Sequence, residues 1–256
     1  MSRSSPAPLA NSARLSALSA LFALPVVAAE LESAGTDVPL TVQRCEAELL
    51  TAREWQSIRH CAERRIIDFC AGRVCARRAL AAYGVNGFDL LSAEDRQPLW
   101  PRGLVGSIAH TDGFAAAVVA EQRLVAGLGI DVERMDAVHS ELWPPICTAS
   151  ELDRLRALSL EEQRLAGALT FVAKEAFFKC QYPLASERFG FDEVELESAS
   201  WSQSEGEFHL RVGRSSRLDQ FLPRDAQRRI PGRYTHRGPY LIGAVALSPV
   251  AERASI

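Results

Sequence analysis

Two apolar segments of this 256-residue chain carry charged residues that the folded protein must accommodate in its interior. One reads Gly129-Ile130-Asp131-Val132-Glu133, and the other reads Phe171-Val172-Ala173-Lys174-Glu175-Ala176-Phe177-Phe178-Lys179. Burying a charge is costly unless a partner, a metal or a ligand compensates it. The three carboxylates and two lysines of these segments therefore predict a site that holds a metal ion and a phosphate-rich ligand.

The first segment places two acids on one face of a predicted strand. Asp131 and Glu133 are two residues apart, so their side chains leave the same face. Their Cβ atoms would be about 6.5 to 7 Å apart, a separation that one hard cation can bridge. Gly127 and Gly129 would let another element approach the strand closely. The alternative is a half-exposed strand with two solvated acids, which the same alternation would also produce.

The second segment places a charged pair inside an aromatic helical stripe. Phe171, Lys174, Glu175 and Phe178 occupy positions i, i+3, i+4 and i+7 of a predicted helix. The alternative is a surface pair of Glu175 with Lys179, worth about 0.3 to 0.5 kcal/mol. Mg²⁺ keeps several waters and needs few carboxylates when phosphates supply other ligands, and lysines provide point charges for phosphate oxygens. The pattern therefore fits a magnesium–pyrophosphate site.

An arginine-rich helix could supply a second anionic subsite. Arg65 and Arg73 are eight residues apart, a little over two helical turns, so they lie close in azimuth. A solvated helix face is the alternative. His110 follows Gly106-Ser107 at the end of a predicted strand, and by itself it is a weak signal because most single histidines are structural.

Composition excludes several classes of function. The formal net charge of −3 provides no global basic field for nucleic acid. The six cysteines form no CxxC pair and do not cluster with the five histidines, which argues against zinc and favours a reducing compartment. Residues 15–29 imitate a secretory signal but are too short for a membrane span. We expect a cytoplasmic protein that does not bind membranes, because the inferred ligand is cytosolic.

The predicted layout is two halves of similar construction. Residues 1–20 are expected to be a disordered tail, residues 21–123 an N-terminal lobe and residues 124–256 a C-terminal lobe, with no close internal repeat. The elements predicted from periodicity and turn residues are a strand near 24–31, a helix over 46–82, a hairpin of 106–110 and 114–120, a strand over 124–133, a helix opened by residues 148–151, a helix over 160–181 ended by Tyr182-Pro183, and strands near 193–197, 207–212 and 241–247.

With these segments in view, the chain resembles the 4′-phosphopantetheinyl transferase superfamily, in particular the branch of enterobactin synthase component D and surfactin-type enzymes. Four segments carry the resemblance in the family's order: residues 65–73, residues 100–110, residues 129–133 and residues 171–180. The resemblance implies an α+β fold of two similar lobes related by a pseudo-twofold axis. It also implies a monomer with coenzyme A and Mg²⁺ in the cleft between the lobes.

The resemblance further implies transfer of the 4′-phosphopantetheine arm of coenzyme A to a serine of an acyl, peptidyl or aryl carrier protein. Asp131, Glu133 and Glu175 would hold Mg²⁺, and Glu175 would also take the serine proton. Lys174 and Lys179 would bind phosphate and stabilise developing charge. The remaining coenzyme A contacts implied are Arg65, Arg73, Trp100, Pro101, Arg102, Ser107 and His110, with Arg96 as a weaker candidate.

Two departures from the family pattern and three alternatives stay open. Ala109 stands where the family often has a hydroxyl residue, and Val172 where a small polar residue is common. The alternatives are a coenzyme A-dependent acyltransferase, a non-catalytic coenzyme A or carrier-protein binding module, and a secreted binding protein. The carrier protein and its pathway, including siderophore biosynthesis, are undetermined, and a basic patch near Arg154, Arg156 and Arg164 is a hypothetical docking surface.

Overall fold

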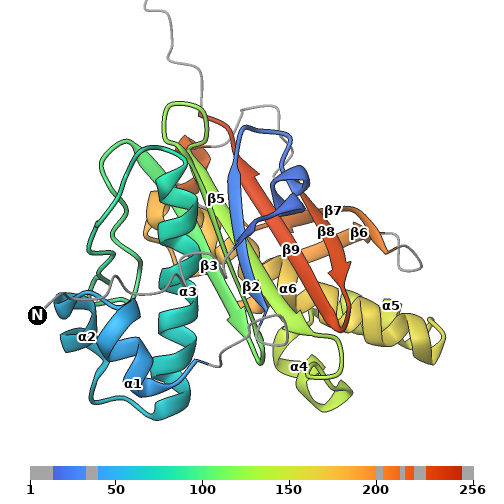
Figure 1. The fold of residues 1–256 in the computed structure, drawn as a ribbon. Coiled ribbons are helices and arrows are strands. Elements are labelled where there is room, and N and C mark those ends of the chain that lie inside the picture. The colour runs from blue at the N-terminus through green and yellow to red at the C-terminus, as the bar shows by residue number, and fades with distance from the viewer. Residues whose placement is uncertain (1–13, 33–39, 200–203, 214–216, 222–228, 250–256) are drawn as a thin grey trace, which may run out of the picture.

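Two antiparallel sheets lie against each other, and each carries one long helix on its outer face (Figure 1). This computed structural model describes residues 14–32, 40–199, 204–213, 217–221 and 229–249. The expected α+β class is confirmed, while the boundary between two lobes and their pseudo-twofold relation stay predictions.

The first sheet has the strand order β1-β2-β4-β3, and every neighbouring pair is antiparallel. Its strands are β1 (Arg14–Leu15), β2 (Val27–Glu32), β3 (Leu104–Thr111) and β4 (Phe114–Glu121). Strands β3 and β4 form the expected hairpin. Residues 114–120 of β4 are all buried, because helix α3 (Glu63–Ala81) covers one face of the sheet and the second sheet covers the other.

The second sheet has the order β5-β9-β8-β7-β6, again antiparallel throughout. Its strands are β5 (Gly127–Arg134), β6 (Val194–Ala199), β7 (Glu205–Val212), β8 (Arg229–Arg237) and β9 (Tyr240–Leu247). Helix α6 (Leu160–Ala185) packs on its outer face. The sequence prediction missed β8, whose Pro231-Gly232 pair is typical of turns yet sits in a central strand.

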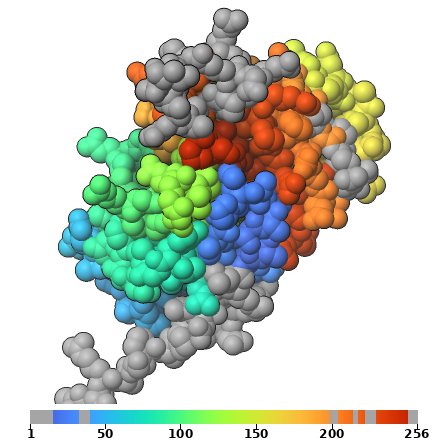
Figure 2. Space-filling model, turned by 90° about the horizontal axis from the view of Figure 1, so that it is seen from above, coloured from blue at the N-terminus to red at the C-terminus, as the bar shows by residue number. Residues whose placement is uncertain are grey.

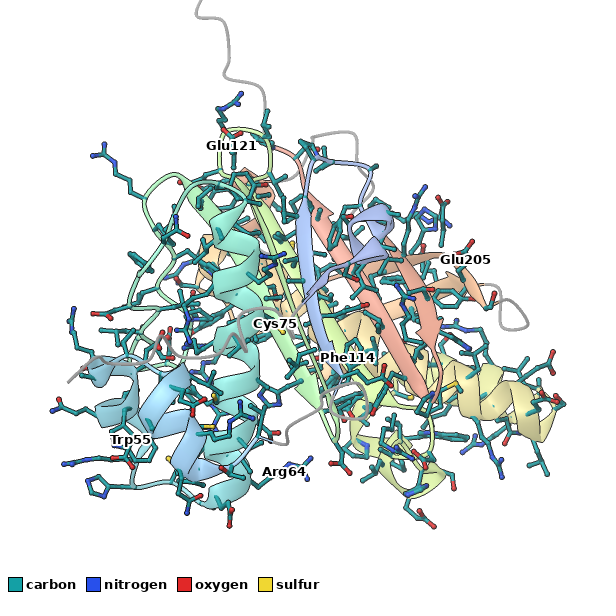
Figure 3. All side chains as sticks on the ribbon, viewed as in Figure 1. Trp55, Arg64, Cys75, Phe114, Glu121 and Glu205 are labelled. Carbon is teal, nitrogen blue, oxygen red and sulfur yellow. The ribbon has the colours of Figure 1, made fainter. Side chains whose placement is uncertain are left out.

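The layers are joined by apolar side chains and by polar contacts between the sheets. Figure 3 shows side chains filling the space between the layers, where Cys75 and Phe114 are buried, whereas Arg64 is exposed. Ser107 Oγ of β3 accepts a hydrogen bond from the backbone N–H of Ile130 in β5, at 3.1 Å. This bond aligns the predicted phosphate-binding hairpin with the strand of the carboxylates.

The predicted helix over 46–82 is wrong as a single element. The chain instead forms α1 (Val42–Arg44), a π-helical turn η4 (Cys45–Leu49), α2 (Ala52–Ile58) and α3. Thr51 and Glu54 form a capping box that opens α2 afresh, and this local hydrogen bonding interrupts the periodic apolar pattern.

Two further boundaries differ from prediction. Pro183 does not end α6, which continues to Ala185 and stops where Ser186 adopts φ 50°. Residues 1–20 are expected to be disordered or weakly helical; residues 14–20 are ordered, since β1 pairs with β2 and Leu18 of the short helix η2 (Ala17–Leu21) is buried, while residues 1–13 lie outside the described residues. Figure 2 shows this N-terminal segment, in blue, between the green and red parts of the surface.

The remaining short elements lie in the connections before and after α6 and between β7 and β8. They are η5 (Ser140–Leu142), α4 (Trp143–Ile146), α5 (Ala149–Arg156), η6 (Phe191–Glu193) and η7 (Leu218–Gln220). The expected cap at residues 148–151 is confirmed, because Thr148 and Glu151 form a capping box at the start of α5. No helix within the described ranges is long and apolar enough to cross a membrane.

Candidate functional site

The site begins where α6 lies directly on β5. A Cβ atom at Gly129 would stand 1.9 Å from the carbonyl oxygen of Ala176, so only glycine permits this approach. The close packing expected from the strand glycines is therefore confirmed, and the approaching element is α6. It sets Glu175 and Lys179 of the helix over the carboxylate face of the strand.

Three carboxylates come together at this contact. Asp131 is 6 % exposed, and Glu133 and Glu175 are half-buried. Burial raises the pKa of all three, and the charge of Asp131 raises the pKa of both glutamates further. Thr111 donates a hydrogen bond to Glu133 at 3.0 Å. Mutual repulsion across this group shows that the acids are not independent solvated side chains, so the alternative of a simple half-exposed strand is excluded for Asp131.

Lys179 is the cation of this group. Its Nζ donates to Asp131 Oδ1 at 2.6 Å, and its side chain is 29 % exposed. The ammonium lowers the pKa of each of the three carboxyl groups, but burial outweighs this effect in each case. The alternative pairing of Lys179 with Glu175 is therefore wrong, because the ammonium binds Asp131.

The carboxylates offer a cation an unused ligand atom. Oδ2 of Asp131 is buried and has no hydrogen-bond partner among the described residues. Within the same residues, no three His, Cys, Asp or Glu side chains are placed as a complete metal-holding group. One buried free oxygen and two neighbouring carboxylates fit Mg²⁺ provided that other oxygens, such as those of phosphate, complete its shell.

A cavity of about 350 Å³ opens beside this group, between α3, β3 and the C-terminal part of α6. Lys179 belongs to both, since it lines the cavity and binds Asp131. Of the residues predicted to bind coenzyme A, those that line the cavity are Arg65, Arg73, Arg96, Trp100, Ser107, His110 and Lys179. Segments far apart in the sequence therefore meet as expected.

Some polar side chains of the cavity lining contact one another or a neighbouring aromatic ring. Arg65 Nη1 lies 3.4 Å from His110 Nε2, and burial is the main cause that lowers the pKa of His110. Arg73 stacks over the Phe69 ring at 4.1 Å, and burial lowers its pKa to about 10. Arg73 thus keeps its charge at neutral pH, whereas His110 is poised to be neutral.

Two predicted residues, Pro101 and Arg102, are not among the described residues that line the cavity. They occupy the turn before β3, in which Gly103 adopts φ 82°. The prediction instead missed Gln97, Phe178, Tyr182 and Arg188, which do line it. Phe178 belongs to the aromatic stripe of residues 171–179, whereas Gln97, Tyr182 and Arg188 carried no charge-in-apolar signal that could have identified them.

Both halves of the chain match family models of one group of enzymes. The model of the 4′-phosphopantetheinyl transferase N-terminal domain matches residues 53–120, and that of the 4′-phosphopantetheinyl transferase superfamily matches residues 127–229. Enterobactin synthase component D of Escherichia coli K12 is 33 % identical over 167 residues, which cover 64 % of this chain and 76 % of that protein. The chain belongs to the 4′-phosphopantetheinyl transferase superfamily.

A second curated relative agrees with this assignment. The 4′-phosphopantetheinyl transferase Npt of Nocardia iowensis is 35 % identical over 158 residues, covering 59 % of this transferase and 68 % of the relative. The matches span about two thirds of the length of such relatives. A solved holo-[acyl-carrier-protein] synthase of Thermotoga maritima aligns over 50 % of this chain and 66 % of its own, with 22 % identity and a TM-score of 0.39.

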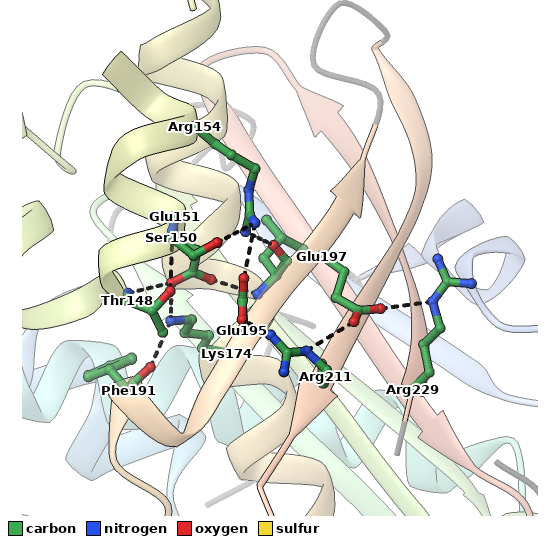
Figure 4. Close-up of polar contacts among 11 residues, drawn as sticks. Thr148, Ser150, Glu151, Arg154, Lys174, Phe191, Glu195, Glu197, Arg211 and Arg229 are labelled. Atoms are coloured by element: carbon green, nitrogen blue, oxygen red, sulfur yellow. Dashed lines mark hydrogen bonds and ion pairs between the residues drawn. The ribbon is translucent and has the colours of Figure 1, made fainter. Parts of the chain in front are cut away.

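Lys174 does not join the transferase site, although it neighbours Glu175 in sequence. It is 3 % exposed, and two of its donors go to Glu151 at 2.6 Å and to the carbonyl of Phe191 at 2.7 Å (Figure 4). The third goes to the carbonyl of Ile146 at 2.8 Å. The prediction that Lys174 binds phosphate is wrong on this geometry, because no donor is left and the cavity lining excludes it. Successive helical residues point about 100° apart, which separates Lys174 from Glu175.

The hypothetical basic docking patch is also largely neutralised. Arg154 pairs with Glu195 at 3.0 Å, and Arg156 pairs with Asp153 at 2.9 Å. Figure 4 shows Arg154 directed onto the strand that carries Glu195. Two of the three arginines therefore offer little free charge to an acidic partner.

Proposed function

We propose that this transferase moves the 4′-phosphopantetheine arm from coenzyme A to a serine of a carrier protein and releases adenosine 3′,5′-bisphosphate. The observation that carries the proposal is the shared position of Lys179. It lines a cavity rich in arginine and also binds the carboxylate group beside that cavity. A pyrophosphate placed at this junction would meet lysine on one side and the carboxylates, through a cation, on the other.

The reaction needs positioning and charge stabilisation more than a strong nucleophile. The serine oxygen forms a bond to the β-phosphorus of coenzyme A, and the bond from that phosphorus to the bridging oxygen breaks. The bridging oxygen leaves with adenosine 3′,5′-bisphosphate. Glu175 takes the serine proton, directly or through a water.

The raised pKa of Glu175 supports its role as the base. Burial raises this pKa, and Asp131 raises it further. A general base works best when its pKa approaches the working pH, because it must be ionised and still accept a proton. Glu175 also lies on α6, one turn before Lys179, so proton acceptance and phosphate binding are set by one rigid element.

Asp131, Glu133 and Glu175 would hold Mg²⁺, with the unpaired Oδ2 of Asp131 as one ligand atom. When bound, the ion would neutralise the charge that develops on the pyrophosphate. Lys179 would share this task. Its contact with Asp131 keeps the ammonium at the edge of the carboxylate group, from which it can reach a phosphate in the cavity.

Arg65, Arg73 and His110 would bind the 3′-phosphate, and Trp100 would contact the adenine. These side chains all line the cavity, together with Ser107. Arg73 spends two donors on neighbouring groups and keeps three of its five for a ligand. Arg96, at φ 73°, lines the same wall and carries a further positive charge.

The carrier protein is an acyl, peptidyl or aryl carrier domain. Because several relatives are enterobactin synthase components, siderophore biosynthesis is the pathway that we propose first. A monomer in the cytoplasm that binds neither nucleic acid nor membrane is part of the same proposal.

The decisive test is intact-mass spectrometry of an apo carrier protein incubated with this enzyme, coenzyme A and Mg²⁺. We expect a mass gain of one phosphopantetheine arm, and a loss of rate of about 10²- to 10⁴-fold in Glu175→Gln. EDTA should abolish the gain, and Glu161→Gln on the exposed start of α6 serves as the matched control.

No mass gain with peptidyl, aryl and acyl carriers, while coenzyme A still binds, would contradict the transferase proposal and favour a binding module. Full activity in EDTA would contradict the metal assignment alone and would favour a metal-independent coenzyme A enzyme.

A further inference from the structure

Glu54 is a carboxylate buried outside the proposed site. It lies on α2, is 0 % exposed and is not among the described residues that line the cavity. Its oxygens accept from Arg77 at 2.7 Å, from the backbone N–H of Thr51 at 3.0 Å and from the backbone N–H of Leu90 at 3.0 Å. A buried charge with this many partners is held in one position.

The contact with Leu90 links Glu54 to the cavity. The N–H of Leu90 donates to Glu54, and the carbonyl of the same residue accepts from Arg73 Nε at 2.6 Å. Arg73 Nη2 also donates to Ser92 Oγ at 2.9 Å. Leu90 is therefore held by two hydrogen bonds. One goes to the carboxylate of Glu54, which does not line the cavity, and the other comes from Arg73, which does.

Leu90 lies at the start of a loop, residues 90–100, that contributes to the cavity lining. Ser92, Gln97 and Trp100 of this loop line the cavity. Backbone hydrogen bonds join residues within the loop. The N–H of Leu99 donates to the carbonyl of Leu91 at 2.9 Å, and the N–H of Ala93 donates to the carbonyl of Gln97 at 2.8 Å. The loop is thus a small closed unit, and the base of that unit is set by Glu54 and Arg73.

Glu54 also acts on the charge of Arg73. Burial is the main cause that lowers the pKa of Arg73 to about 10, and the positive charges of Arg77 and Arg65 lower it too. Glu54 is the acid that opposes them and raises this pKa. Without its charge, a buried guanidinium would lie beside two other guanidinium groups with less compensation.

We propose that Glu54 is a positioning residue for 3′-phosphate recognition, acting through Arg73 and the loop that begins at Leu90. This inference rests on the proposed function, in which Arg73 binds the 3′-phosphate of coenzyme A. Glu54 touches no substrate. It fixes the orientation of the Arg73 guanidinium, which lines the cavity and has two of its five donors bound to Leu90 and Ser92.

The test compares coenzyme A with 3′-dephospho-coenzyme A as substrates for wild type and Glu54→Gln. Gln keeps the shape and one acceptor oxygen but removes the charge. We expect the KM for coenzyme A to rise about 10-fold with kcat within twofold of wild type, the size of one lost charge-assisted contact. With the dephospho substrate, the KM of Glu54→Gln should stay within twofold of wild type, because the group that Arg73 binds is absent.

Controls separate this role from folding. Glu48→Gln, on the neighbouring π-helical turn and 41 % exposed, should leave both KM values unchanged. If Glu54→Gln does not fold, the double variant Glu54→Gln/Arg77→Met removes the buried carboxylate together with its partly exposed guanidinium partner, which proteins tolerate better than one unpaired charge. It should show the same KM rise confined to coenzyme A.

Two outcomes would overturn the inference. Equal losses with both substrates, or a loss confined to kcat, would show that Glu54 supports only the general fold of the N-terminal half. Wild type that does not distinguish coenzyme A from its dephospho form would remove the 3′-phosphate subsite itself, and this failure is visible without any variant.

Discussion

Two lysines of α6, five residues apart, each bind a carboxylate at 2.6 Å, yet they serve different purposes. Lys174 binds Glu151 in a cluster that is buried and complete. Both oxygens of Glu151 are used, since Oε2 also accepts from the N–H of Thr148 at 2.7 Å and Oε1 accepts from the N–H of Leu196 at 2.6 Å. Every donor and acceptor of that pair has a partner.

Lys179 binds Asp131 in a group that is incomplete. Asp131 leaves one oxygen unpaired among the described residues, and Glu133 and Glu175 add negative charge beside the single ammonium of Lys179. The contrast shows that distance alone does not identify a site. A saturated buried pair holds elements together, whereas a buried group with surplus charge and a free oxygen is prepared for a ligand.

The largest difference should appear in stability. Lys174→Met leaves Glu151 buried without its countercharge and should lower the free energy of unfolding by about 3 to 5 kcal/mol. Lys179→Met should cost only about 1 to 2 kcal/mol, because Asp131 can take up a proton when its cation is lost. Urea denaturation followed by circular dichroism measures both, and equal losses in the two variants would contradict the comparison.

Activity should show the reverse order. Lys179→Met removes a cation that lines the cavity and should lower kcat/KM for carrier modification by about 10²-fold. Lys174→Met, assayed at a temperature at which the folded fraction is complete, should stay within about threefold of wild type. A loss with Lys174→Met as large as that with Lys179→Met would place Lys174 back in the catalytic group.

The smallest effect concerns pH. Because burial raises the pKa of Asp131, the folded state binds this proton more tightly than the unfolded state does, and stability falls as pH rises above the ordinary carboxyl range. The Asp131→Asn variant has no carboxyl group at this position and therefore does not take up this proton. Without Mg²⁺, it should be more stable than wild type by about 1 kcal/mol at pH 7, the low end of the cost of an unpaired buried polar atom.

The gain of Asp131→Asn should shrink as pH falls toward 4 and should reverse when Mg²⁺ and coenzyme A are added at pH 7. Thermal unfolding at each pH measures it. A difference between the two proteins that does not change with pH would show that the Asp131 carboxyl has no raised pKa.

Features that depend on local spacing were predictable from the sequence. Asp131 and Glu133 share a face because a strand alternates with period two, and Gly129 marks the close approach of another element because it has no Cβ. The hairpin whose turn follows His110 was predictable from two apolar runs on either side of a short turn. These features need only the neighbouring residues in the chain.

Features that depend on a distant partner were not predictable in the same way. Lys174 and Glu175 are both charged residues in one apolar segment. The placement of α5 in the folded protein is what shows that Glu151 binds Lys174. Tyr182, in the last turn of α6, and Arg188, just after the helix, carry no motif, yet both line the cavity. The sheet position of β8 overrode the turn preference of Pro231 and Gly232.

By itself, then, the sequence determined that charged groups had to be buried, on which strand and helix they lay, and the family to which those segments are similar. The tertiary structure alone decided which charges are compensated within the protein and which remain available to a ligand. The physical reason is that the free energy of a buried charge depends on every partner within a few ångströms. Those partners come from elements whose relative placement no local pattern specifies.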